Sequence, residues 1–347
     1  MIQLFSPTIR RKEMDSVLTC MVDEKIGPGD INARFVSEIK NFLNLEGAVV
    51  FRNTSIALSR ALKALLLPEK SAIVISALAP KWQKIAIEEA GFSVILAEVD
   101  ESTFCITAQT AAAAIEQGGR AIIISQPFGQ IPEDIAQIAE LGVPIIEDIS
   151  ESAGGSLGEK KSGTFAEIAV WGLEATDIVT AGGGAALCFS QKSAWEAFAP
   201  IFRKMVSSDI LPDLNCALCL VSLKEWRKNE EIRRTIASVF RSSVLQSRRH
   251  KTLPRGADCD FTAAGFPLVV SDGVKDVLSF LERKEIESKM AFQDSAISLI
   301  SDEISESERE NLKTAFSLFS RTVQIPLYPR LKSSHIQTIS KVLAALP

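Results

Sequence analysis

The sequence predicts an α/β fold in which a mostly parallel, doubly wound large domain is followed by a smaller C-terminal α/β domain. Two observations lead to this prediction. Short β-branched runs alternate with helical patterns over the first two thirds of the 347 residues. Such alternation is typical of parallel strands joined by right-handed crossover helices. After about residue 200 the pattern changes to long, charged helices.

The strands of the large sheet are predicted from apolar runs that have no polar face. Runs of this kind indicate strands that are buried on both faces of a sheet. They are residues 72–76, 93–99, 121–125, 143–147, 168–172 and 185–189. Between them, leucines at helical spacing predict a helix over residues 55–67. A second helix is predicted over 132–141, because it begins with proline and acidic residues and stops at Gly142.

The C-terminal third is predicted to form the smaller domain. A charged helix over residues 222–240 is followed by the basic turn 247–255, which is either a linker or a helix end. We therefore divide the chain into residues 1–240, with the N-terminal segment in the large domain, and residues 241–347. The remaining elements are predicted to be a strand over 265–270 and helices over 274–283 and 334–346.

Composition and charge narrow the class of protein. Hydrophobic residues make up 46% and charged residues 23%, as in ordinary globular domains. The net charge of −5 gives no electrostatic reason to expect nucleic acid binding. No uncharged apolar stretch is long enough to span a membrane, and the start lacks the apolar region of a signal peptide. We therefore expect a cytoplasmic protein with no membrane partner.

The cysteines and histidines do not predict a metal site. Cys216 and Cys219 have the spacing of a ligand pair, but they lie in the apolar stretch LNCALCLVSL, where they fall on one face of a helix. A zinc site needs further ligands, and the two histidines, His250 and His335, stand alone in the sequence. We expect buried, reduced thiols.

Three features fall where parallel strands end, which is where ligands gather in open α/β sheets. Residues 53–55, Asn-Thr-Ser, begin a helix and form either a phosphate site or an ordinary helix cap. Glu147 and Asp148 follow a strand, so each carboxylate faces the cleft or caps the next segment. The glycine-rich loop 180–184 permits either close approach of a ligand or a tight connection.

The order of these features resembles the DegT/DnrJ/StrS sugar aminotransferase family. The segment VVFRNTSIALSRAL is similar to the family's strand–(S/G)GT–helix phosphate segment. The segment IIEDISESAGGSLGEKKSGTFAEIAVWGL is similar to its block IEDAAQAHGA…G…GSFGDIGCFSF, and DLNCALCLVSL and VQIPLYPRL are similar to ELQAALGLAQL and LPLYPGL. The resemblance runs almost from end to end. It implies a fold-type-I aminotransferase architecture.

The resemblance also implies pyridoxal phosphate (PLP) or pyridoxamine phosphate (PMP) as cofactor. A transaminase needs a lysine amine to hold the cofactor as an imine and to shuttle a proton. It also needs a carboxylate on the pyridine nitrogen, a role that falls to Asp148, and donors around the phosphate, which fall to Thr54 and Ser55. The family's sites lie at dimer interfaces, which implies a homodimer or a heterodimer with an active paralogue.

Several functional positions of the family are altered here. The segment FSFHxTKxITxGEGG aligns with residues 171–185, and this alignment puts Asp177 where the Schiff-base lysine should be. No lysine occurs between Lys161 and Lys192, so a small shift of the alignment does not recover one. The phosphate-binding serine is Gly172, and the Gln or His three residues beyond the ring-binding aspartate is Glu151. Covalent PLP is therefore not expected.

Three hypotheses follow from these losses. In the first, transamination is lost and the fold is kept for binding or pairing in the context of sugar or polysaccharide biosynthesis, with a nucleotide sugar as a ligand. In the second, the chain is an enzyme that uses PLP or PMP non-covalently, as dehydratase relatives do, with Asp177 as a general base. In the third, it is a conventional transaminase whose lysine comes from elsewhere, such as Lys160, Lys161 or a partner chain.

Overall fold

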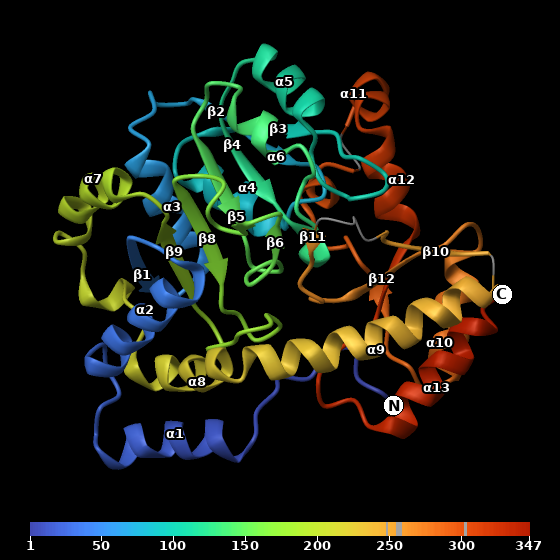
Figure 1. Ribbon diagram of the computed structural model, residues 1–347. Coiled ribbons are helices and arrows are strands. Elements are labelled where there is room, and N and C mark those ends of the chain that lie inside the picture. The colour runs from blue at the N-terminus through green and yellow to red at the C-terminus, as the bar shows by residue number, and fades with distance from the viewer. Residues whose placement is uncertain (248, 255–258, 302–303) are drawn as a thin grey trace.

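The fold is built around a seven-stranded sheet. The computed structural model describes residues 1–247, 249–254, 259–301 and 304–347, and the sheet order is β1-β9-β8-β5-β4-β2-β3 (Figure 1). Its strands are β1 (Gly47–Phe51), β2 (Ala72–Ser76), β3 (Ser93–Ala97), β4 (Gly119–Ser125), β5 (Ile145–Asp148), β8 (Ile168–Gly172) and β9 (Ala185–Phe189). β9 runs antiparallel to β1 and β8, and the other pairs are parallel. The predicted mostly parallel sheet is confirmed.

Helices cover both faces of this sheet, which explains why its strands lack a polar face. Along β1, Val49 and Phe51 pack into one core cluster, whereas Ala48 and Val50 pack into another. The helices are α2 (Asp30–Leu43), α3 (Thr54–Ala64), α4 (Lys81–Glu89), α5 (Ala108–Glu116), α6 (Ile135–Ala139), α7 (Lys192–Phe202) and α8 (Asp213–Lys224). The first cluster includes residues of α3, α4 and α7, and the second includes residues of α2 and α8.

The predicted helix ends differ from those observed. The helix predicted over 55–67 stops at Ala64, because Leu66 has a positive φ of 51°. The helix predicted over 132–141 is only the short α6. The charged helix predicted over 222–240 is instead α9 (Trp226–Ser247), which is separate from α8. Cys216 and Cys219 are fully buried on α8, as predicted.

The C-terminal part has its own antiparallel sheet of order β10-β12-β14-β13. Its strands are β10 (Lys251–Thr252), β12 (Phe266–Val269), β13 (Lys289–Met290) and β14 (Thr322–Ile325). Helices α9, α10 (Val274–Arg283) and α13 (Ser333–Ala344) supply its core. A smaller α/β unit is therefore present. A further three-stranded sheet contains β11 (Cys259–Asp260), β6 (Ser156–Leu157) and β7 (Lys160–Lys161).

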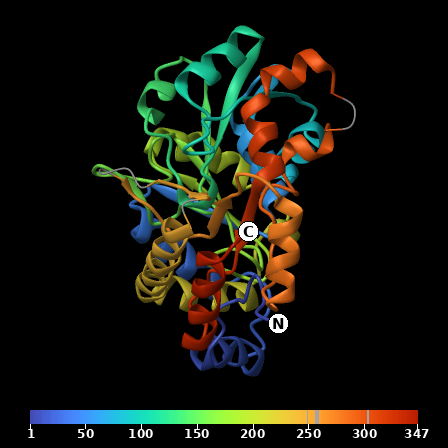
Figure 2. The same cartoon turned by 90° about the vertical axis from the view of Figure 1, so that its right-hand side faces the viewer.

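Helix α9 is a single continuous helix that connects the large-sheet part to the C-terminal part (Figure 1). The predicted division between residues 240 and 241 falls inside this helix, and the division itself stays a prediction. Of the basic turn 247–255, Arg248 and Arg255 lie outside the described residues. Helices α11 (Glu306–Asn311) and α12 (Lys313–Arg321) complete the C-terminal part, and α1 (Arg11–Val22) lies against α8 (Figure 2).

No helix in the part of the chain that the structure describes has both the length and the apolar character needed to cross a bilayer.

Candidate functional site

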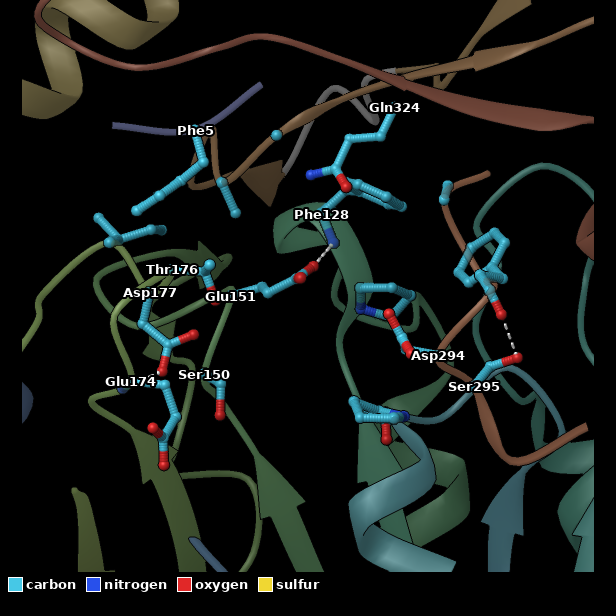
Figure 3. Close-up of a pocket in the computed structure, with 18 of the residues that line it drawn as sticks. Phe5, Phe128, Ser150, Glu151, Glu174, Thr176, Asp177, Asp294, Ser295 and Gln324 are labelled. Carbon is cyan, nitrogen blue, oxygen red and sulfur yellow. Dashed lines mark hydrogen bonds between the residues drawn. The ribbon is translucent and has the colours of Figure 1, made fainter. Parts of the chain in front are cut away.

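A cavity of about 370 Å³ opens at the carboxyl ends of the parallel strands, where the C-terminal part meets the large sheet (Figure 3). Four of the six site residues predicted from sequence line it: Thr54, Asp148, Glu151 and Asp177. Ser55 and Gly172 do not line it, although Gly172 lies directly behind Asp177. These four residues therefore lie together at this edge of the sheet, and their roles in a site stay predictions.

The last two residues of β5 have opposite roles, because consecutive side chains of a strand point to opposite faces. Glu147 is fully buried and accepts hydrogen bonds from the backbone N–H groups of Phe165 and Ala166, both at 2.8 Å, and from the Gln126 amide at 3.0 Å. It therefore caps the segment that precedes β8. Asp148 lines the cavity. Each of the two alternatives left open by the sequence applies to one of these carboxylates.

Asp148 is held by donors from its own chain. Its Oδ2 accepts a hydrogen bond from Gln83 Nε2 at 2.6 Å. Its Oδ1 accepts from the backbone N–H of Ser150 at 3.1 Å and from the Ser150 hydroxyl at 2.6 Å. Burial raises the pKa of Asp148, and the hydrogen bonds from Ser150 and Gln83 act in the opposite direction.

The segment 53–55 begins α3 at the edge of the cavity. Asn53 is the helix cap, because its side-chain oxygen accepts from the backbone N–H of Ile56 at 2.8 Å. Thr54 is buried and faces the cavity, and Ser55 is half-buried beside it. The cap is therefore Asn53, which leaves the Thr54 hydroxyl at a helix N-terminus that faces the cavity.

Asp177, which the alignment of the sequence puts at the position of the family's lysine, lies on the floor of the cavity with Glu174 and Ser150 (Figure 3). Its Oδ2 accepts from the backbone N–H of Glu174 at 2.7 Å. Burial raises the pKa of Asp177 well above its ordinary value, and the charges of Glu151, Asp148 and Glu174 raise it further. A carboxylic acid held in this way is a proton donor or acceptor, and it has no amine to form an imine.

The absence of a side chain at Gly172 is what leaves room for Asp177. A Cβ placed on Gly172 would lie 2.7 Å from Asp177 Oδ2 and 2.8 Å from Ser150 Oγ. Real Cβ atoms do not approach other atoms this closely, so a serine at this position would displace both neighbours. The substitutions at positions 172 and 177 are therefore linked by contact.

Glu151 crosses the cavity towards Phe128, whose backbone N–H donates to its carboxylate (Figure 3). The pKa of Glu151 is raised to about 7, chiefly by burial and also by the charge of Asp148, while the hydrogen bond from Phe128 and the charge of Lys289 act in the opposite direction. Lys289 lies on β13 in the C-terminal part. Among the described residues that line the cavity it is the only cation, and it also lies 3.7 Å from Asp294.

Sequence reasoning missed several residues of the site. Gln83 and Lys289 belong to no recognisable motif. Both lie far from Asp148 in the sequence, so nothing in the sequence indicated that they are close to it in space. The N-terminal segment was also missed. Ile2 pairs with Ile286, and this pairing brings Leu4 and Phe5 to the cavity. Trp82 and Pro80 also line the cavity.

The residues of this cavity do not fit a lysine-bound cofactor. The lysine position is Asp177, and Lys160 and Lys161 form the exposed β7, away from the cavity lining. The carboxylates of Glu151, Glu174 and Asp177 line the same space and would repel a phosphate group. We also find no group of three or more His, Cys, Asp and Glu residues arranged for a metal ion within the described ranges.

The fold and the position of the cavity define the class of this protein, which is the fold-type-I aminotransferase architecture. The aminotransferase TlmJ from Streptoalloteichus hindustanus superposes with a TM-score of 0.90 at 21% identity, over 99% of this chain and 98% of that one. A protein from Streptococcus pneumoniae described as a sugar aminotransferase, in its PMP-form, gives 0.88 at 15% identity over 99% and 97% of the two chains.

The chain belongs to the DegT/DnrJ/EryC1/StrS aminotransferase family, whose profile matches residues 7–344. Among curated proteins, a GDP-perosamine synthase from Vibrio cholerae is 22% identical over 98% of this chain and 97% of its own length. The family resemblance read from the sequence is therefore confirmed.

Proposed function

We propose that this chain has lost transamination and keeps the aminotransferase fold for binding or for pairing with another subunit, in the context of sugar or polysaccharide biosynthesis. The observation that carries the proposal is the carboxyl group of Asp177 at the lysine position, held by the backbone N–H of Glu174 at 2.7 Å. A carboxyl group cannot form the imine on which transamination depends.

The surroundings of Asp177 support this proposal. Asp148, Glu151 and Glu174 line the same cavity. A lysine side chain that entered from elsewhere would be held in its protonated form by these carboxylates, and a protonated amine does not form an imine. Lys289 is the one described cation of the lining, and it already lies between the acidic groups of Glu151 and Asp294. It does not replace the lost lysine.

The inherited cofactor positions are part of the proposal. We assign Asp148 to the place of the ring-binding carboxylate and Thr54 with Ser55 to the place of the phosphate donors. Glu151 and Gly172 stand at two positions where, in this proposal, the family's contacts to the cofactor are lost: Gly172 replaces the phosphate-binding serine, and Glu151 replaces the Gln or His. The ligand we propose is a nucleotide sugar, in keeping with the name of the Vibrio relative, and the assembly is a cytoplasmic homodimer or a heterodimer with an active paralogue.

A direct assay tests the loss of transamination. The purified protein is incubated with PLP, an amino acid donor and a nucleotide-linked keto sugar, and an active member of the family is the positive control. We expect no amino sugar product and no covalent cofactor after borohydride reduction. Turnover by this chain alone, abolished by Asp148→Asn, would refute the proposal.

The alternative function is an enzyme that holds PLP or PMP non-covalently. The observation that favours it is that Thr54 and Asp148, the inherited phosphate and ring positions, line one cavity with Asp177. Burial moves the pKa of Asp177 upwards, which is the direction a general base at neutral pH needs. The test is whether Asp177→Asn abolishes an activity that Asp148→Asn also abolishes.

A further inference from the structure

Asp148 is the one inherited carboxylate that a pyridine cofactor would require, yet in this chain its hydrogen bonds are already made. An ionised carboxylate has about four acceptor positions on its two oxygens. Three of them receive donors here: Gln83 Nε2 at 2.6 Å, the Ser150 hydroxyl at 2.6 Å and the Ser150 backbone N–H at 3.1 Å. Both oxygens are engaged.

Neither side-chain donor is free to turn away. Gln83 is fully buried, and its amide exchanges hydrogen bonds in both directions with the Ser125 hydroxyl, at 3.0 and 3.3 Å. The Ser150 hydroxyl accepts a hydrogen bond from the backbone N–H of Gly172 at 2.8 Å while it donates to Asp148. Asp148 and its two donors therefore link α4, β4 and the end of β8 at the base of the cavity.

The residue at position 150 is itself a departure. The motif IEDAAQAHGA, which aligns with residues 146–155, has alanine where this chain has Ser150. An alanine supplies no hydroxyl to the carboxylate. The same hydroxyl lies 2.8 Å from the place where a Cβ on Gly172 would be. The serine at position 150 and the glycine at position 172 thus depend on one another.

We propose that Gln83 and Ser150 are specificity-determining residues that close this cavity to a pyridine cofactor, because they supply to Asp148 the hydrogen bonds that a ring nitrogen would supply. The inference rests on the proposed function, since it supplies a reason why this cavity would not take up the cofactor. A ring N–H that approached Asp148 would find one acceptor position of about four left, on an oxygen that already accepts a short hydrogen bond, and the loss of a single bond of this kind is worth roughly tenfold in affinity.

The test compares two probes on four forms of the protein. The probes are PMP and its analogue with C–H in place of the ring nitrogen, and Trp82 in the cavity wall reports their binding by fluorescence quenching. The forms are wild type, Ser150→Ala, the double variant with Gln83→Met added, and the control Gln126→Met. Gln126 lines the cavity and donates its amide to a buried carboxylate of β5, but that carboxylate is Glu147, so this control alters the cavity wall without removing a hydrogen bond from Asp148.

We expect the double variant to bind PMP roughly tenfold more tightly than wild type, Ser150→Ala alone to show part of this gain, and Gln126→Met to show none. The analogue without the nitrogen should gain nothing in any form. Equal gains for both probes would mean that the variants merely loosen the cavity, and no gain for PMP would mean that Asp148 was accessible from the start. Either result overturns the inference.

The two proposals can fail separately. Turnover by the wild type refutes the loss of transamination, whatever the variants bind. The ratio of the two probes' gains decides the role of Gln83 and Ser150, whatever the wild type catalyses. Thermal unfolding of each form confirms folding, and if the double variant does not fold, Ser150→Ala carries the same comparison with a smaller expected gain.

Discussion

The contact between positions 172 and 177 can be measured as a coupling free energy. Gly172→Ala adds a Cβ that would lie 2.7 Å from Asp177 Oδ2 and 2.8 Å from Ser150 Oγ. Asp177→Ala removes the first of these two neighbours and leaves the second in place. The two single variants and the double variant therefore form a cycle that isolates the contact between residues 172 and 177.

The magnitude follows from the two distances. Both are shorter than van der Waals contact, and over-packing of a filled site costs about 1–3 kcal/mol. The φ of Gly172 lies outside the left-handed region, so no backbone strain is added. In the Asp177→Ala background one of two close contacts is gone. We therefore expect Gly172→Ala to cost about half as much there, which is a coupling of about 1 kcal/mol.

The assay is urea unfolding of the four forms, followed by far-UV circular dichroism. Gly27→Ala is the control, because a Cβ on Gly27 meets nothing within 4 Å, and it measures the gain from stiffening the unfolded chain alone. If the costs of the two single variants add to within about 0.5 kcal/mol in the double variant, the contact does not exist as described, and the linked substitution of residues 172 and 177 has no physical basis.

Three further predictions concern the same site. The pKa of Glu151 is about 7 in the folded protein and about 4.3 in an unfolded chain, so the folded protein binds the extra proton between these values and stability should fall as pH rises from about 4 to about 7; Glu151→Gln should flatten this dependence of the melting temperature. Asn53→Ala removes the cap of α3 and should cost about 1 kcal/mol in urea unfolding, whereas Ser55→Ala should cost less. Asp177→Lys alone should not take up PLP in a borohydride-stable form, because the surrounding carboxylates raise the pKa of the new amine; mass spectrometry of the reduced protein would detect the adduct that contradicts this.

The large sheet could be predicted because each of its strands is marked by a short apolar run in its own segment of the sequence. Strands 72–76, 168–172 and 185–189 were placed to the residue, since each is a short, mostly apolar run with the length of a strand that is buried on both faces of a sheet. Helix ends were less certain. α3 stops at Ala64 although leucines continue to Leu67, because the chain turns at the exposed Leu66. The spacing of hydrophobic residues predicts which side chains face a core. It does not predict the residue at which the helix ends.

The site could be predicted only where a motif marked it. Asp148 and Asp177 were found by alignment with family blocks, and both line the cavity. Gln83 and Lys289 could not be found in this way, because their role comes from tertiary contacts between residues far apart in the sequence. The sequence also could not assign different roles to Glu147 and Asp148. Only the structure shows that Glu147 caps a buried segment and that Asp148 lines the cavity.

The departures from the family at positions 150, 172 and 177 show no connection in the sequence, where position 150 is 22 residues from position 172. In the structure they touch: the Ser150 hydroxyl accepts from the Gly172 backbone, and both Ser150 and Asp177 occupy the space that a side chain at position 172 would need. A serine at position 172 would be too close to both Ser150 and Asp177. Asp177→Lys alone changes one member of this group of contacts and leaves Ser150 and Glu151 in the cavity, which is a further reason to expect that it will not take up PLP.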